Sequence, residues 1–393
     1  MEQKKLIYLD SGATTFPKPE EVYVAMDLFF RNYGVNPGRS GYDLCMMAGS
    51  IIEETRKLLT NFFNGTDPNR LIFTANATDA LNLVIFGLLK KGDHAITSNI
   101  EHNSVLRPLF HLYKYEGVEV DYAPFDSQGI VDPEEFSHRF KNNTKLVAIN
   151  HCSNVIGTVQ PIQEIGELCR ERGIILLVDA AQSAGKIPID MEKMNIDIIA
   201  FTGHKSLMGP MGIGGLYVRE GLEIRHTRAG GTGVRSAVRT HLDEYPYRLE
   251  YGTPNLPGIA GLNAGIKWLL KEGMSKIHDH EMQLLCILRD GLRRIDGVTL
   301  YCQGNLTNHI GILTFNVDGL EAGNTGIMLD VDYNIASRTG LHCAPLVHSQ
   351  LGTEKIHGSV RFGIGPFNTV EDIEYAIKAV GDIAHIRQKQ KVH

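Results

Sequence analysis

The chain has 393 residues, more than a single compact core usually holds, and this length predicts roughly two to three domains. Hydrophobic residues make up 43% of the sequence and charged residues 21%, which is ordinary for a globular protein. The net charge of -6 excludes the basic footprint of a nucleic-acid-binding protein, so we expect no nucleic-acid partner.

Short apolar runs alternate with helical patterns through the first two-thirds of the chain. Strands are predicted at residues 70–74, 94–98, 145–150, 174–178, 196–201 and 213–218, and helices at about 78–89, from 103 onward and at 162–172. This alternation predicts an α/β fold, with a mainly parallel central sheet flanked by helices. Ligands of such sheets bind beyond the carboxyl ends of the strands, so the residues after each run are the site candidates.

A turn-rich segment with two prolines, Tyr251 to Pro257, interrupts this alternation. After it, helices are predicted at 258–271, 274–295 and about 369–386, and strands near 310–317 and 359–364. These elements predict a smaller C-terminal α+β domain. We therefore expect an N-terminal segment (residues 1–20), a large domain (21–255) and a small domain (256–393).

The six cysteines show no CxxC pair and no Cys/His spacing typical of a metal site. They are Cys45, Cys152, Cys169, Cys286, Cys302 and Cys343. The sequence begins MEQKKLIYLD, without the apolar core of a signal peptide, and no apolar stretch reaches the roughly twenty residues of a membrane span. We expect a cytoplasmic protein with free thiols, no bound metal and no membrane contact.

Lys205 lies in an uncharged, glycine-rich loop directly after the run that ends at Phe201. Asp179 ends another apolar run, GIILLVDAAQ. Each has an ordinary interpretation by itself, a solvated lysine and a helix N-cap. Together at strand ends they are the pair that a pyridoxal phosphate (PLP) enzyme needs, an amine for the aldehyde carbon and a carboxylate for the ring nitrogen.

Residues Ala75 to Thr78 join a predicted strand to a predicted helix. The free amides of a helix N-terminus and the hydroxyl of Thr78 suit a phosphate dianion. The alternative is that Thr78 only N-caps the helix. A second run, Gly230 to Gly233, offers further backbone donors or is simply a flexible turn.

His102, Asn154 and Gln182 each follow a predicted strand. An imidazole at such a place can stack on a pyridine ring and shuttle protons, although a lone histidine is more often a packed or solvent-facing residue. Either amide can hydrogen-bond the phenolic oxygen of the cofactor.

These residues, in this order, resemble the class V, fold-type I PLP enzymes, and among them the cysteine desulfurases. The resemblance extends from YLDSGATT near the start to VRFGIGPFNT near the end. The segment Arg338 to Ala344, RTGLHCA, is similar to the RxGxHCA signature of the Suf-type (group II) desulfurases and of selenocysteine lyase-like proteins.

The resemblance implies roles for individual residues. Lys205 is then the Schiff-base lysine, Asp179 the partner of the pyridinium nitrogen, His102 the stacking acid/base and Cys343 the sulfur acceptor. The remaining implied contacts are Ala77, Thr78, Thr202 and His204 with the phosphate, Gly231 and Thr232 with the phosphate of the second subunit in a homodimer, Gln182 and Asn154 with the phenolic oxygen or substrate, and Arg338 and Arg361 with the substrate.

The activity implied by the resemblance is conversion of L-cysteine to L-alanine, with the sulfur passing to Cys343 as a persulfide and then to a protein acceptor. His342 and Arg338 are candidates to stabilise the Cys343 thiolate, whose loop is too polar for an inert core cysteine. A selenocysteine lyase, a class V aminotransferase and a catalytically silent sulfur-relay protein remain alternatives. His151, Cys152, His348 and His357 receive no role, and the glycine run departs from the family pattern as GGTGVRS.

Overall fold

The computed structural model describes residues 5–37 and 41–391, and within these ranges the side chains up to residue 387. Its centre is a seven-stranded sheet with the order β2-β8-β7-β6-β5-β3-β4. The strands are β2 (Leu71–Thr74), β3 (His94–Ser98), β4 (Glu119–Ala123), β5 (Thr144–Asn150), β6 (Ile175–Asp179), β7 (Ile198–Thr202) and β8 (Gly214–Val218). Strands β3 to β7 pair in parallel, whereas β8 runs antiparallel to both β2 and β7. The predicted mainly parallel α/β sheet is confirmed.

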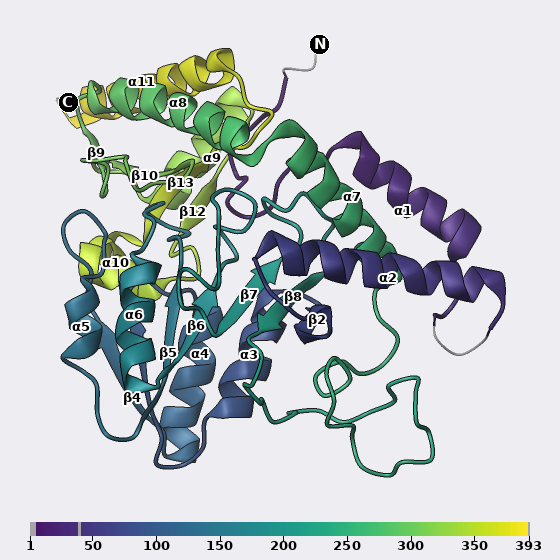
Figure 1. Ribbon diagram of the computed structural model, residues 1–393. Helices are drawn as coiled ribbons and strands as arrows, with labels where there is room; N and C mark the ends of the chain where they lie inside the picture. Colours follow the sequence, from purple (N-terminus) through teal and green to yellow (C-terminus); the bar gives the residue numbers. More distant parts are fainter. Residues whose placement is uncertain (1–4, 38–40, 392–393) are drawn as a thin grey trace.

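Both faces of this sheet are buried, because successive side chains of each strand point to opposite faces. In β7, Ile199 and Phe201 belong to one hydrophobic cluster, and Ile198 and Ala200 belong to another. The connecting helices cover the two faces (Figure 1). Helices α3 (Ala77–Leu88) and α4 (Asn103–His111) contribute to one cluster, and α5 (Pro133–Ser137) and α6 (Ile162–Arg172) to the other.

Three long helices lie together at one side of the sheet, α1 (Glu20–Tyr33), α2 (Asp43–Phe62) and α7 (Leu256–Glu272). The sequence analysis did not predict α1 and α2. Helix α1 buries Val22 and Phe29 but exposes Tyr23, Leu28 and Phe30, so its apolar residues do not mark a single inward face. Two short helical segments lie elsewhere in the large unit. They are η1 (Pro68–Arg70), directly before β2, and η2 (Leu112–Glu116), directly after α4.

A second unit is built on the four-stranded antiparallel sheet β12-β13-β10-β9. Its strands are β9 (Val298–Leu300), β10 (Ile312–Val317), β12 (Arg338–Gly340) and β13 (Ser359–Gly363). Its helices are α8 (Met274–Arg293), α9 (Ala322–Tyr333) and α11 (Val370–Lys391). Between β12 and β13 lie α10 (Pro345–Leu351) and η3 (Thr353–Ile356), and Val347 of α10 packs in the hydrophobic cluster of the central sheet. Near the N-terminus, β1 (Ile7–Tyr8) pairs in parallel with β11 (Ile335–Ala336), and Ile7 and Leu9 belong to the hydrophobic cluster of this unit.

The packing of the hydrophobic clusters changes within α8 rather than at the turn-rich segment before α7. Leu256, Ile259 and Leu262 of α7 share a cluster with the central sheet, whereas Leu284 and Leu288 of α8 join the cluster of the second unit. Within the described ranges, no helix combines the length and apolar character needed to cross a membrane.

Candidate active site

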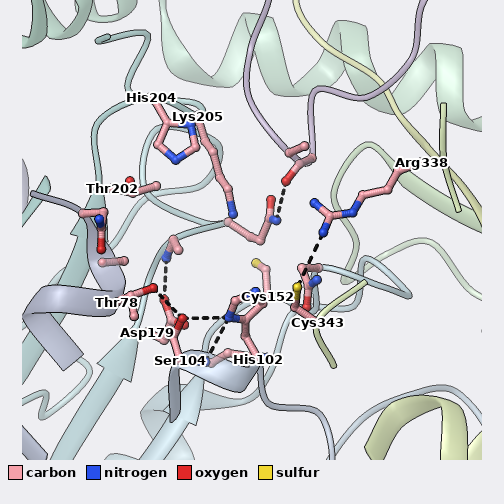
Figure 2. A pocket seen from close by; sticks show the side chains of 18 of the residues that line it. Thr78, His102, Ser104, Cys152, Asp179, Thr202, His204, Lys205, Arg338 and Cys343 are labelled. Carbon is pink, nitrogen blue, oxygen red and sulfur yellow. Dashed lines mark hydrogen bonds between the residues drawn. The ribbon is translucent and has the colours of Figure 1, made fainter. Parts of the chain in front are cut away.

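A cavity of about 300 Å³ lies at the carboxyl ends of β5, β6 and β7, where the second unit meets the central sheet (Figure 2). Every residue that the sequence analysis assigned to the cofactor or the substrate lines it, apart from Gly231 and Thr232. These two lie in the segment between β8 and α7, where Gly231 is exposed and both line a separate surface cavity. The structure therefore brings together residues that are far apart in the sequence.

Lys205 and Asp179 enter the cavity from adjacent strands. Asp179 is the last residue of β6, and its Oδ1 accepts a hydrogen bond from the Ala181 amide at 2.9 Å. Burial raises the pKa of the Asp179 carboxyl, while this amide and the Lys205 ammonium act against the shift. Burial lowers the pKa of Lys205 to about 8, and Asp179 opposes this change. An amine with a lowered pKa is a better nucleophile near neutral pH because more of it is uncharged.

The N-terminus of α3 forms one end of the cavity. Asn76 is the N-cap, since its Oδ1 accepts a hydrogen bond from the Asp79 amide at 3.0 Å. The alternative that Thr78 only caps the helix is therefore wrong, and its hydroxyl is available to other groups. Nearby, Thr202 Oγ1 and His204 Nδ1 are buried without a hydrogen-bond partner among the described residues. Buried polar atoms are rarely left unpaired, and a phosphate dianion accepts hydrogen bonds from such groups.

His102 projects into the cavity from the start of α4. It is the N-cap of this helix, and its Nδ1 accepts a hydrogen bond from the Ser104 amide at 3.1 Å. Burial lowers the pKa of His102 to about 4, and the charges of Lys205 and three arginines act in the same direction. Ser104 also lines the cavity. The sequence did not predict Ser104 as a site residue, because it is simply the second residue of a helix.

Arg361 is fully buried in the middle of β13. Its Nη2 donates to Asp10 Oδ1 at 2.7 Å, and its Nη1 donates to the Asn154 carbonyl at 2.8 Å. Its Nε has no partner among the residues described. A Cβ at Gly12 would lie 3.0 Å from Arg361 Cζ, a tight contact, so a larger residue here would require the guanidinium to shift. Asp10 and Gly12 were not predicted as site residues, although YLDSGATT carried part of the resemblance.

Cys343 lies on a short segment with left-handed backbone at Gly340, His342 and Cys343 (φ 99°, 50° and 59°). Its carbonyl accepts a hydrogen bond from the Asn103 amide at 2.7 Å, and the His342 carbonyl accepts one from Asn154 Nδ2 at 2.7 Å. Arg338 Nη2 lies 3.5 Å from Cys343 Sγ (Figure 2). These contacts hold the thiol at the cavity beside a cation.

Of the two candidates to stabilise this thiol, the structure brings Arg338 to it. The buried His342 ring instead places its Nε2 3.2 Å from Ser359 Oγ, and burial puts the His342 pKa well below its ordinary value. Cys152 lines the same cavity but is buried, and burial raises the pKa of its thiol strongly. A thiol held in that form is a poor nucleophile.

Residues 7–376 match the family model described as aminotransferase class-V, which spans most of the chain. The chain belongs to the class-V aminotransferase family. It is 37% identical to a probable cysteine desulfurase of Pyrococcus abyssi, over 94% of this chain and 92% of that protein. It is 35% identical to a probable cysteine desulfurase of Methanothermobacter thermautotrophicus, over 96% of this chain and 94% of that protein.

Solved structures of this family share the fold. The apo cysteine desulfurase of Thermococcus onnurineus NA1 superposes with a TM-score of 0.90 at 35% identity, covering 97% of this chain and 95% of that one. The cysteine desulfurase CsdA of Escherichia coli, in an S-sulfonic acid form, gives a TM-score of 0.86 at 29% identity, covering 96% and 94%. The class V, fold-type I resemblance expected from the sequence is confirmed.

Proposed function

We propose that this protein is a PLP-dependent cysteine desulfurase, which converts L-cysteine to L-alanine and takes the sulfur onto Cys343 as a persulfide. The single observation that carries the proposal is that Cys343 Sγ, 3.5 Å from Arg338, lines the same cavity as Lys205 and Asp179. An aminotransferase needs the lysine and the aspartate but has no use for a cation-paired thiol beside them. The names of the relatives above agree with this assignment.

The cavity residues fit the cofactor that the family uses. Bound PLP supplies an electron sink that allows bonds next to the α-carbon of an amino acid to break. Lys205 supplies the amine for its aldehyde, and Asp179 supplies a carboxylate for the ring nitrogen. The phosphate contacts are Ala77, Thr78, Thr202 and His204, and Gln182 supplies an amide to the phenolic oxygen. The unpaired buried atoms of Thr202 and His204 support this placement.

Arg361 and Asn154 are placed to bind the carboxylate of the substrate. A guanidinium is suited to a carboxylate because its planar donors match the two oxygens. Arg361 still has an unpaired Nε, and Asn154 has an unpaired Oδ1. Arg338, whose Nη2 faces Cys343, provides a second positive charge where the substrate sulfur and the attacking thiolate meet.

In the sulfur-transfer step, the Cys343 thiolate attacks the sulfur of the substrate. A bond forms between the two sulfurs, and the Cβ–S bond breaks with its electron pair on carbon, where a proton takes the place of sulfur. The carbon is reduced as the sulfurs reach the persulfide level, so no external oxidant or reductant is consumed. Arg338 stabilises the thiolate by a charge-assisted contact. The persulfide then passes to a protein acceptor.

We also propose a homodimer that works in the cytoplasm, and the free cysteines support a reducing compartment. Helices α1 and α2 expose large apolar side chains, among them Tyr23, Phe30 and Met46. Exposed apolar surface of this kind is typical of subunit contacts. We expect a second copy of the chain to cover this apolar surface. Gly231 and Thr232 of each subunit should then contact the phosphate bound by the other subunit. A fully active monomer in light scattering would contradict this arrangement.

The experiment that tests the function measures alanine and persulfide formed from L-cysteine by the PLP-loaded protein. Wild-type protein is expected to form both in equal amounts, and Cys343→Ala is expected to form neither. Cys286→Ala is the matched control, because Cys286 is also partly exposed but does not line the cavity. Desulfuration that survives in Cys343→Ala would remove this thiol from the mechanism.

The same variants separate the proposal from its rivals. Selenium leaves carbon more easily than sulfur, so Cys343→Ala is expected to retain activity on L-selenocysteine while losing it on L-cysteine. The relative turnover of the two substrates by the wild-type protein then decides between desulfurase and selenocysteine lyase. An α-keto acid in place of alanine would point to an aminotransferase. A protein that takes up no PLP would leave only a sulfur-relay role.

A further inference from the structure

The first turn of α4 holds the His102 ring in a defined orientation. The Ser104 backbone nitrogen lies 3.1 Å from His102 Nδ1 and donates its hydrogen to it. A backbone N–H has one hydrogen and no lone pair, so it can only donate. Nδ1 must therefore carry a lone pair and no proton. The single proton of a neutral imidazole then lies on Nε2, and protonation of Nδ1 would set two hydrogens against each other.

The hydroxyl of Ser104 connects this ring to the proposed phosphate site. Ser104 Oγ lies 2.8 Å from His102 Nδ1 and 2.7 Å from Thr78 Oγ1 (Figure 2). Because Nδ1 has no proton to give, the Ser104 hydroxyl donates either to Nδ1 or to Thr78. A phosphate beside Thr78 accepts hydrogen bonds only, so the Thr78 hydroxyl turns to the phosphate and its oxygen accepts from Ser104. The chain of donors then runs from Ser104 through Thr78 to the phosphate.

We infer that Ser104 is a positioning residue: its amide fixes His102 as the neutral Nε2–H tautomer, and its hydroxyl links that ring to the group bound at Thr78. The tautomer follows from the protein alone, and only the identity of the bound phosphate rests on the proposed function. His102 then acts through a fixed Nε2–H, as a hydrogen-bond donor and a stacking surface. Its Nε2 has no lone pair with which to take a proton.

The surroundings of His102 favour the neutral ring. The largest charge effects on it come from Lys205, Arg338, Arg107 and Arg361, and all four are cationic. Together with burial they lower the pKa of His102 to about 4. His102 therefore keeps the stacking role expected from the sequence but does not accept a proton as a base. The Lys205 amine is then the group that moves the proton at the substrate.

The test uses the full-length protein with 15N-labelled histidine, and follows the two ring nitrogens of His102 by NMR with and without PLP. The His102 signals are assigned from their loss in His102→Gln. We expect an unprotonated Nδ1 and a protonated Nε2 in both states, across the ordinary histidine range around pH 6.5. A proton on Nδ1 in the PLP-loaded wild-type protein overturns the inference. The tautomer is read in the wild-type protein, so this test stands even where a substitution at Ser104 fails to fold.

Two substitutions at Ser104 separate its amide from its hydroxyl. Ser104→Ala keeps the amide, so the tautomer is expected to stay fixed. Ser104→Pro removes the N–H, so we expect mixed tautomers and a His102 pKa closer to the ordinary value. A fixed Nε2–H tautomer in folded Ser104→Pro would show that another group sets it, and would overturn the role of the amide.

The hydroxyl link is tested by ligand affinity. Loss of one hydrogen bond in Ser104→Ala is expected to weaken PLP binding by about twofold to tenfold. Pyridoxal lacks the phosphate, so its affinity is expected to be unchanged. Equal weakening of both ligands, or of neither, would overturn the link to the phosphate. If the protein binds neither ligand, the proposed function fails while the tautomer in the free protein is still measured.

Discussion

Two sides of the cavity are held in place in different ways. The sheet side consists of Asn150, Asp179 and Thr202, each the last residue of a strand. Asn150 lies directly opposite Asp179 in the register of β5 and β6. Backbone ladders therefore set the positions of these residues, and the side chains need few contacts of their own.

The opposite side, which we call the small-unit side, consists of Arg338, Cys343 and Arg361, together with Asp10, which holds Arg361 from outside the cavity. Arg338 and Arg361 pair in the antiparallel register of β12 and β13. Individual hydrogen bonds join this side to the large unit, such as the Asn103 amide to the Cys343 carbonyl and Asn154 Nδ2 to the His342 carbonyl, both at 2.7 Å. The difference indicates that substitutions on the sheet side should remove chemistry outright. Apart from the reacting thiol of Cys343, substitutions on the small-unit side should shift rates and affinities by degrees.

The two cysteines of the cavity show the same contrast. Cys152 follows β5 and is buried with Ile310 and Ile312, so its thiol stays protonated. Cys343 lies on the left-handed segment beside Arg338 and is partly exposed. Reactivity therefore depends on which side supplies the thiol, although both thiols line one cavity.

The largest effect beyond loss of the Cys343 thiol is expected for Lys205→Ala, in the loop that follows β7 of the sheet side. Removing the amine that binds the cofactor and moves the proton should lower alanine formation by at least about 10²–10⁴-fold. Lys193→Ala, at an exposed lysine, is the control and should leave the rate unchanged. Alanine release under saturating cysteine checks this. A Lys205→Ala rate within tenfold of wild type would mean that the sheet side does not carry the central chemistry.

An intermediate effect is expected on the small-unit side, for Arg338→Met. A hydrogen bond to a charged group contributes about 1.5–3 kcal/mol, so loss of the Arg338 contact should slow alkylation of Cys343 by iodoacetamide about tenfold to a hundredfold near neutral pH. Mass spectrometry of the modified peptides gives this rate. Cys286 in the same protein serves as the internal control, and an unchanged Cys343 rate would show that Arg338 does not activate the thiol.

A smaller effect is expected for the partner of Arg361. Asp10→Ala removes the carboxylate that accepts the hydrogen bond from Arg361 Nη2. The KM for L-cysteine should then rise about tenfold, as expected when a hydrogen bond of about 1.4 kcal/mol is lost. Asp10→Asn keeps an oxygen that can accept from Nη2, so its KM should stay close to wild type. Steady-state kinetics of the two variants separate orientation from charge. A KM that rises equally in both would assign the effect to charge.

Sequence reasoning found the sheet side almost completely. Parallel strands that are buried on both faces appear as continuous apolar runs, and the residues after these runs meet at one edge. Asp179 and Lys205 could therefore be located from the pattern, together with the cofactor roles that such a pair suggests, whereas Thr202 came from the resemblance.

The small-unit side was predictable only through the resemblance. Arg361 lies inside a strand, where no local pattern marks it, and the carboxylate of Asp10 reaches it from the other end of the chain. Ser104 looks like any serine in the first turn of a helix. Such contacts join segments that have no common periodicity, so a single sequence does not reveal them.

The last prediction concerns stability, and it tests whether burying the Lys205 amine costs free energy of folding. The pKa of Lys205 is lowered from 10.5 to about 8 in the folded protein. Between these values the unfolded chain binds a proton that the folded chain does not, so the free energy of unfolding should rise with pH in this window. Each such proton contributes a slope of about 1.4 kcal/mol per pH unit.

Urea unfolding of cofactor-free protein between pH 8 and 10 should show a shallower slope for Lys205→Met than for wild type. Lys18, whose pKa is also lowered to about 8, contributes equally to both proteins, so equal slopes would mean that the Lys205 amine is stabilised in its charged form.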